Sequence, residues 1–324
     1  MTYVAHLSRG LVLGAGGALG AAWMIGALSA LRDVEAYEPR SVDMLVGTSA
    51  GSVLASLLAS QVSVEEMLDR LDGSTAPHVE GTGAVNPFDV HAALAAIPRP
   101  QLLPGNLLLA ARAVTRPRSH TFMTLVAGLA PRGRGDLAPL ADFIREAQGP
   151  GGWPLHPTTW IVAMDFDTGR RIVFGRSGAP VATLPDAVIA SSSAPGFFPP
   201  VRIGAARYVD GGGISMTNAD VLRRANLDEV LILAPMLAPP DDPRRSSLAL
   251  ADRRLRNAFT RRLRFETAQL EACGTAVRVL GPTADDLEIM GVNLMDPTRR
   301  CEVAERAMQT TRARLEQPTG PRAA

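Results

Sequence analysis

The chain has 324 residues, of which 46% are hydrophobic and 5% aromatic, and its formal net charge at pH 7 is +1. This length allows one large α/β domain or two small ones, with a core packed mainly by aliphatic side chains and alanine. The near-neutral charge, with no basic patch interleaved with aromatic residues, excludes a nucleic-acid surface. All 33 basic residues are arginine, which excludes a Walker-type phosphate loop and any lysine nucleophile or base.

The first 60 residues show a strand–loop–helix pattern twice. The apolar run Leu11–Leu13 stops at glycines and predicts a buried strand, followed by a helix over about residues 20–32. The run Val42–Val46 predicts a second strand, followed by a helix of small and aliphatic residues over 50–60. This alternation favours a parallel sheet with helices on its faces.

Residues 10–31 contain no charged side chain, so this stretch also fits a signal peptide or a first membrane span. Its Gly-x-x-x-Gly spacings suit a membrane helix. Its six glycines in 22 residues fit a strand–loop–helix better, because each glycine inside a helix costs about 1 kcal/mol. We therefore expect this segment to belong to the folded protein, with no cleaved signal peptide.

The middle of the chain has a looser pattern. Between about residues 73 and 152, prolines, glycine-rich joints and short helical pieces predict an inserted helical cap over the sheet. Residues 160–175 then form two strand-like runs about an Asp-Thr-Gly turn, which predicts a hairpin. The same tripeptide, Asp167–Gly169, occurs in aspartic proteases, but no second D-T-G or D-S-G completes a dyad here.

The C-terminal part predicts two more core strands, Val230–Ala234 and Val277–Leu280, separated by a long helix over about 246–273. A last helix is expected from about Pro297. The long helix carries eight arginines between residues 244 and 264 against one aspartate. It could therefore lie on anionic lipid, although a solvated helix face is the default interpretation.

The sharpest local motif is V-G-T-S-A-G-S at residues 46–52, which fits G-x-S-x-G with Ser49 at its centre. Gly47 and Gly51 suit a sharp strand-to-helix turn, where neighbouring backbones leave no room for a Cβ atom. Such a turn exposes the serine hydroxyl at the positive end of a helix. The motif predicts a nucleophilic serine, while an ordinary helix cap explains the same residues more simply.

A histidine base for Ser49 is disfavoured, because the last histidine is His156, in a proline-rich loop. The better candidate is Asp210, where the strand end Tyr208–Val209 is followed by Gly211–Gly213. Three glycines keep bulk away from the carboxylate and let another backbone approach it. A plain Asp-Gly turn between strands is the alternative.

The third element is G-A-G-G-A-L-G at residues 14–20, between the first strand and its helix. Successive N–H groups at a helix start form an anion-binding concavity, which in acyl transfer holds the oxyanion. A dinucleotide site is disfavoured, because Leu19 occupies the last position of a strict G-x-G-x-x-G. The second strand, moreover, ends in the Ser49 motif rather than in a ribose-binding acid.

Metal and disulfide chemistry have little support in the sequence. The five histidines are scattered, which leaves no visible metal site. The cysteines Cys273 and Cys301 could form a disulfide, but two buried thiols in a reducing cytosol fit better. The abundance of arginine, alanine, glycine and proline is typical of a GC-rich bacterial genome.

The glycine loop, G-x-S-x-G and D-G-G occur in the order of the patatin-like phospholipase family, which the chain resembles over about residues 8–316. The block A-V-I-A-S-S-S-A-P before Asp210 also resembles the family pattern. The resemblance implies a three-layer α/β/α sandwich with a mostly parallel sheet and a helical cap, and residues 317–324 are expected to be a disordered tail.

The resemblance also implies a catalytic dyad that cleaves acyl esters of phospholipids, lysophospholipids or glycerides. Ser49 is then the nucleophile, Asp210 the proton acceptor, and the amides of Gly16, Gly17 and Ala18 the oxyanion hole. The supporting glycines of the three motifs are Gly14, Gly20, Gly47, Gly51, Gly211 and Gly212. No metal or cofactor is expected. The expected partner is a lipid substrate with transient membrane or micelle contact, at a cytoplasmic location that includes the inner membrane face.

Two residues depart from the family pattern: Ala15 replaces the first glycine of the loop block, and Leu19 stands where the family usually has Arg or Lys. Backbone donors survive both changes, whereas a side-chain charge is lost. A lipid-binding or regulatory protein with weak or no catalysis on the same scaffold is therefore the alternative function.

Overall fold

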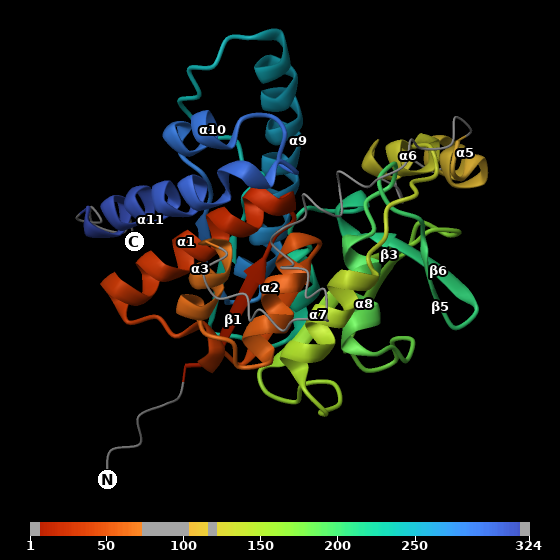
Figure 1. Cartoon of the computed structure of the whole chain (residues 1–324), viewed down its shortest axis with the longest axis horizontal. Coiled ribbons are helices and arrows are strands. Elements are labelled where there is room, and N and C mark those ends of the chain that lie inside the picture. The colour runs from red at the N-terminus through yellow and green to blue at the C-terminus, as the bar shows by residue number, and fades with distance from the viewer. Residues whose placement is uncertain (1–6, 73–103, 116–121, 318–324) are drawn as a thin grey trace, which may run out of the picture.

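A mixed eight-stranded sheet forms the middle layer of the structure, a computed structural model that describes residues 7–72, 104–115 and 122–317 (Figure 1). The strand order is β5-β6-β3-β2-β1-β7-β8, and β4 pairs with β3 outside this path. The strands are β1 (Arg9–Leu13), β2 (Met44–Thr48), β3 (Thr158–Asp165), β4 (Arg171–Phe174), β5 (Val201–Ile203), β6 (Ala206–Asp210), β7 (Glu229–Leu233) and β8 (Ala276–Leu280).

Most of the sheet is parallel. The neighbouring strands β3, β2, β1, β7 and β8 all run in one direction, whereas β3–β4, β3–β6 and β5–β6 are antiparallel pairs. The α-helices are α1 (Gly17–Glu35), α2 (Ala50–Ala59), α3 (Val64–Asp72), α5 (Leu107–Thr115), α6 (Phe122–Leu129), α7 (Ala138–Gln148), α8 (Leu184–Ser192), α9 (Ser247–Glu271), α10 (Ala284–Met290) and α11 (Arg300–Glu316). Short 3-10 helices are η1 (Pro39–Ser41), η2 (Gly211–Gly213), η3 (Ala219–Arg224) and η4 (Pro297–Arg299).

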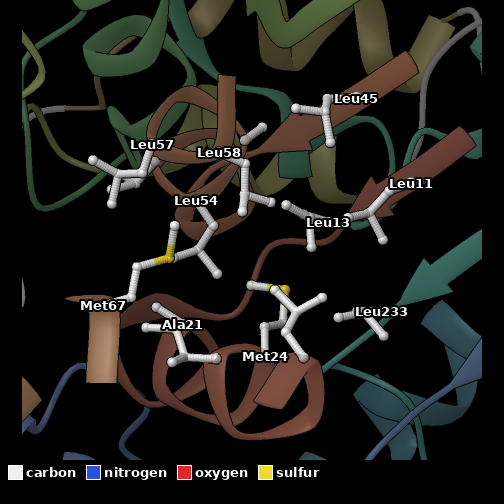
Figure 2. Close-up of a cluster of buried hydrophobic side chains, with 14 of the residues drawn as sticks. Leu11, Leu13, Ala21, Met24, Leu45, Leu54, Leu57, Leu58, Met67 and Leu233 are labelled. Carbon is white, nitrogen blue, oxygen red and sulfur yellow. The ribbon is translucent and has the colours of Figure 1, made fainter. Parts of the chain in front are cut away.

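Helices cover both faces of the sheet, which confirms the predicted three-layer α/β/α class. Alternate residues of β1 show the two faces: Leu11 and Leu13 belong to one core, and Val12 belongs to the other. The larger core includes side chains of α1, α2, α3, α8, α10 and α11, while η3 and α9 cover the opposite face. Figure 2 shows part of the larger core, where strand residues meet α1, α2 and α3: Leu11, Leu13, Ala21, Met24, Leu45, Leu54, Leu57, Leu58, Met67 and Leu233.

The uncharged stretch 10–31 folds as most of β1, a short loop and most of α1. Nearly every side chain of α1 between Ala18 and Leu31 is buried, which explains why charge is absent there. Across residues 7–72, 104–115 and 122–317, no helix has the length and apolarity needed to cross a membrane. The stretch is apolar because α1 lies between the sheet and other helices, with α11 packed along it.

The other predicted elements are found with small shifts of their ends. The predicted hairpin is β3 and β4, and the Asp167–Gly169 tripeptide is the turn between them. The eight arginines between residues 244 and 264, six of them in α9 and two just before it, fall into two groups. One group forms ion pairs with acidic side chains: Arg244, Arg253, Arg256 and Arg262. The other group is exposed: Arg245, Arg254, Arg261 and Arg264.

The predicted interval 73–152 is described only for residues 104–115 and 122–152, which contain α5, α6 and α7. The rest of that interval, and residues 318–324 of the predicted tail, lie outside the described residues. The prediction of two buried thiols is wrong for Cys273, which is exposed. Cys273 follows the last turn of α9, where the chain turns outward through Gly274 at φ 86°. Cys301 is half-buried, and the two thiols are not joined.

We expect Gly26→Ala to destabilise the fold, because α1 and α11 touch at this point. A Cβ atom on Gly26 would lie 2.1 Å from the carbonyl oxygen of Ala304, so the two helices would have to separate. The loss should be about 1–3 kcal/mol, as for other overpacked cores, despite the gain in helix propensity. Urea unfolding measures it. Gly152→Ala, which has open space around it, is the matched control and should change the free energy of unfolding by less than about 0.5 kcal/mol.

Candidate active site

Ser49 sits in a strained turn between β2 and α2. Its backbone has φ 53° and ψ −123°, a conformation that non-glycine residues adopt rarely and usually at functional sites. The two glycines of the motif allow the turn to pack closely. A Cβ atom on Gly51 would lie 1.9 Å from the carbonyl oxygen of Leu13, and one on Gly47 would lie 2.5 Å from the Cα of Ser52. The predicted close backbone approach is therefore present.

Ser191, in α8, links the Ser49 turn to the neighbouring strand β3. The hydroxyl of Ser191 donates to the carbonyl oxygen of Val162 on β3 at 2.6 Å and accepts the N–H of Ser49 at 2.9 Å. Two residues later, the carbonyl oxygen of Ser193 accepts the N–H of Asp210 at 3.0 Å. The Ser-Ser-Ser run therefore contacts both candidate catalytic residues through hydrogen bonds.

The sheet register brings Asp210 beside the Ser49 turn. Thr48 pairs with Val162 on one edge of β3, and Asp210 pairs with the next residue, Ala163, on the other edge. The end of β2 and the end of β6 are therefore level, with only β3 between them. Ser49 and Asp210, which are 161 positions apart in the chain, line one pocket.

The carboxyl group of Asp210 is buried, with 8% of the residue exposed. Burial raises its pKa from 3.8 to about 6, although hydrogen bonds from the Ser49 hydroxyl and from the N–H of Gly212 oppose the shift. The Gly212 N–H lies 2.7 Å from Oδ1. At neutral pH this carboxylate is mostly ionised, and it is a stronger base than an exposed aspartate.

The glycine loop has both fixed and unused amides. Gly14 donates to the carbonyl oxygen of Leu233 at 2.9 Å, and Ala15 donates to that of Met216 at 2.7 Å, so the start of the loop is held in place. By contrast, the next three N–H groups donate to no acceptor within the described residues: Gly16, Gly17 and Ala18. All three residues line the same pocket as Ser49 and Asp210. Their amides, at the N-terminus of α1, are available to an anion.

The two departures in the loop leave these amides in place. Ala15 is 5% exposed. Leu19 is fully buried in the larger core, at the position where the resemblance predicts Arg or Lys. The N–H of Leu19 donates to the carbonyl oxygen of Leu294 at 3.0 Å. The loop therefore has its backbone donors but no side-chain charge.

The pocket has a volume of about 410 Å³ and an almost entirely apolar lining. Among the described residues that line it, Asp210 alone carries a charge. Its walls come from α6, the start of α7 and the segments that follow α8, β6, β7 and α10. The larger side chains are Met123, Val126, Leu137, Leu140, Phe197, Phe198, Met216, Met236, Leu294 and Met295. Such a pocket suits a hydrocarbon chain that ends at Ser49.

The other candidates of the sequence lie elsewhere. His156 is exposed and does not line the pocket, and the remaining four histidines lie outside the described residues. Asp167 forms an ion pair with Arg207. The part of the chain that the structure describes contains no group of three or more His, Cys, Asp or Glu that could hold a metal ion.

The geometry combines a strained serine, a buried carboxylate and unused amides around one apolar pocket, an arrangement suited to a serine hydrolase of the α/β/α class. The family model described as patatin-like phospholipase matches residues 11–223. The chain therefore belongs to the patatin-like phospholipase family, whose membership supports lipid hydrolase activity. A comparison with curated protein sequences found no significant match.

Three solved structures are similar to the chain. VipD from Legionella pneumophila is 15% identical with a TM-score of 0.42, and the match covers 96% of this chain and 67% of that one. The type III effector protein ExoU is 18% identical with a TM-score of 0.43, covering 96% and 53%. ExoU–SpcU from the type III secretion system of Pseudomonas aeruginosa is 20% identical with a TM-score of 0.36, covering 96% and 51%. The chain thus spans about half to two thirds of the chains it matches.

Sequence reasoning did not find Ser191, which bonds to the Ser49 turn, or the pocket-wall residues Met236 and Leu294. Ser191 lies in a run of three consecutive serines, Ser191–Ser193, a residue type whose hydroxyl often bonds to nearby backbone groups, which is the signal that could have found it. Met236 and Leu294, which form part of the wall, carry no local signal. They follow strands and helices far along the chain and reach the pocket only in the folded protein.

We expect Asp210→Asn to stabilise the protein at alkaline pH. Because folding raises the pKa of Asp210 from 3.8 to about 6, its contribution to stability is complete below about pH 4 and is lost as the pH rises through 6. Ionising the buried group then costs about 3 kcal/mol. Urea unfolding should show the variant to be up to about 3 kcal/mol more stable than wild type at pH 8, and nearly equal at pH 4.

The exposed residue Asp241 offers the control for this measurement. Asp241→Asn should leave the free energy of unfolding nearly unchanged at both pH values. A gain from Asp210→Asn that is the same at pH 4 and pH 8 would contradict the raised pKa.

Proposed function

We propose that the chain hydrolyses acyl esters of lipids with Ser49 as nucleophile and Asp210 as proton acceptor. The observation that carries this proposal is the common pocket: Ser49, Asp210 and the three unused amides all line it, and the rest of its lining is apolar. Membership of the patatin-like phospholipase family supports the same reaction class.

In the first half-reaction, Ser49 Oγ attacks the ester carbonyl carbon while its proton passes to Asp210. The negative charge that forms on the carbonyl oxygen is held by the amides of Gly16, Gly17 and Ala18. Each such donor is worth about 2.7–4 kcal/mol of transition-state stabilisation. When the tetrahedral intermediate collapses, the alcohol or lysolipid leaves with the proton from Asp210, and the acyl group stays on Ser49.

In the second half-reaction, water attacks the acyl-enzyme and gives its proton to Asp210. The oxyanion forms again at the same amides. Collapse breaks the ester to Ser49, releases the fatty acid and returns the proton to Oγ. Every step uses groups of this chain, so the scheme requires no metal or cofactor.

The pocket favours recognition of the acyl chain over recognition of a charged head group. Its large side chains are methionine, phenylalanine and leucine, and the loop residue Leu19 offers no charge because it is buried in the core. Phospholipids, lysophospholipids and glycerides all present such an acyl ester. We propose further that residues 8–316 act as one domain, because β7 and β8 extend the same sheet and α11 packs along α1.

The second candidate is a lipid-binding or regulatory protein that does not turn over its ligand. The observations that favour it are Ala15 and Leu19, which change the glycine block without changing its backbone. The two candidates differ in the reactivity of Ser49. A fluorophosphonate probe labels an activated serine and leaves an inert one free.

We expect Ser49→Ala and Asp210→Asn each to lower ester hydrolysis by at least about 1,000-fold, because each removes one member of a unit that acts together. The assay compares wild type and both variants on a panel of phospholipid, lysophospholipid and glyceride substrates. Unchanged circular dichroism shows that the variants are folded. Substantial hydrolysis by either variant would contradict the Ser49–Asp210 dyad. A wild-type protein that neither hydrolyses any substrate of the panel nor reacts with the probe would favour the lipid-binding alternative.

Lipid access is proposed to occur over an apolar surface on α5 and α6. The α5–α6 surface comprises five side chains that are between 39% and 65% exposed: Leu107, Leu108, Val114, Val126 and Leu129. Val126 also lines the pocket, as does Phe197, which is 45% exposed. In Figure 1 the two helices lie together at one side of the molecule. An exposed apolar surface that is continuous with an apolar pocket suits contact with a membrane or micelle.

We expect Leu107→Gln with Leu108→Gln to weaken hydrolysis of lipid in vesicles at least about tenfold, because full burial of even one leucine in the membrane contributes roughly 1.5–3 kcal/mol. Hydrolysis of a short-chain ester in solution should stay within about twofold of wild type. The control changes two still more exposed apolar residues that do not line the pocket, Leu155→Gln with Val181→Gln. Equal loss in both double variants, or equal loss on both substrates, would contradict the proposed surface.

A further inference from the structure

One buried side chain connects the two turns that carry Ser49 and Asp210. Asn218 is fully buried. Its Nδ2 donates to the carbonyl oxygen of Ser215 at 2.7 Å and to Oγ1 of Thr48 at 3.2 Å. A longer contact of 3.4 Å reaches the carbonyl oxygen of Gly211. Thr48 precedes Ser49 directly, and Gly211 follows Asp210 directly. The side-chain amide of Asn218 therefore connects the neighbours of both candidate catalytic residues across β3.

The orientation of this amide is fixed from its other side. Oδ1 of Asn218 accepts a hydrogen bond from Nη1 of Arg171 on β4 at 3.2 Å. Arg171 in turn donates two hydrogen bonds to the carboxylate of Asp220, at 2.5 and 2.9 Å. Since a guanidinium can only donate, Oδ1 must face Arg171, and Nδ2 must therefore face Thr48 and Gly211.

The backbone around Asn218 is also held. Glu266 of α9 is fully buried, and its Oε2 accepts the hydroxyl of Thr217 at 2.6 Å and the N–H of Ala219 at 3.0 Å. Its other oxygen accepts Nε of Arg262 at 2.9 Å. The residues on either side of Asn218 are thus anchored to α9, while Asn218 itself has the left-handed φ of 52°, which asparagine tolerates better than most residues.

We infer that Asn218 is a positioning residue, which holds the Ser49 turn and the Asp210 turn at the spacing needed for proton transfer. The inference rests on the proposed function. Asn218 does not line the pocket, so it acts through Thr48 and Gly211 rather than on the substrate. Proton transfer requires the two groups to stay within hydrogen-bond reach, and a misplacement of about 1 Å can cost about 100-fold in rate.

The test measures Ser49 labelling by a fluorophosphonate probe, and kcat and KM on a short-chain ester, in two variants. Asn218→Gly removes the side chain and tolerates the left-handed backbone, and Asn218→Asp keeps the shape but removes the Nδ2 donors. Both should lower kcat and the labelling rate about 100-fold, with KM within about threefold. The control is Asn226→Asp, because Asn226 has the same φ of 52° but is exposed; it should match wild type.

A third variant keeps the test decisive if Asn218 variants do not fold. Thr48→Val removes only the Oγ1 acceptor and should lower the labelling rate about tenfold, the value of one neutral hydrogen bond, at an unchanged unfolding temperature. Where Asn218→Gly folds, adding Thr48→Val should cost nothing more, because the hydrogen bond that Thr48→Val removes is already absent without the Asn218 side chain. Wild-type kcat in folded Asn218 variants, wild-type labelling in Thr48→Val, or a lower unfolding temperature with unchanged kcat would overturn the inference. A wild type that neither reacts with the probe nor hydrolyses ester defeats the proposed function instead.

Discussion

The arrangement of the site depends on one close contact between backbones, where Gly51 of α2 meets the end of β1. The missing Cβ atom lets the turn after Ser49 approach the carbonyl oxygen of Leu13, where a methyl group would lie only 1.9 Å away. Because the glycine loop begins at the next residue, Gly14, this contact fixes the loop relative to Ser49. The glycine loop after β1 and the Ser49 turn after β2 thereby lie together in one site.

Backbone groups supply much of what the site needs, which explains how it accommodates unusual residues. Gly16, Gly17 and Ala18 line the pocket with Leu19 beside them, and the loop is held through the N–H groups of Gly14 and Ala15 rather than through a side chain at residue 19. Side-chain changes in such a loop alter its local charge without removing its donors. Leu19 becomes part of the core instead.

Much of this could be predicted from sequence, because the signals are local. Apolar runs that stop at glycines marked β1 and β2, and three glycine-containing motifs marked Ser49, Asp210 and the loop, whose catalytic roles stay predictions. The pairing of β3 between β2 and β6, the bridge by Asn218 and the wall residue Met236 could not be predicted, since each depends on contacts between segments far apart in sequence. The exposed Cys273 was missed because residue type alone does not show where a helix ends.

The anchors of the glycine loop lie late in the chain, and this affects the order in which the protein can mature during synthesis. The carbonyl oxygens that accept the N–H groups of Gly14 and Leu19 belong to Leu233 and Leu294, and α1 is covered by α11. A nascent chain that has reached residue 218 already contains Ser49, Asp210, the whole loop and Met216, which holds Ala15, but not Leu233 or Leu294. Nearly the entire domain must therefore be synthesised before all the carbonyl groups that hold the loop are present.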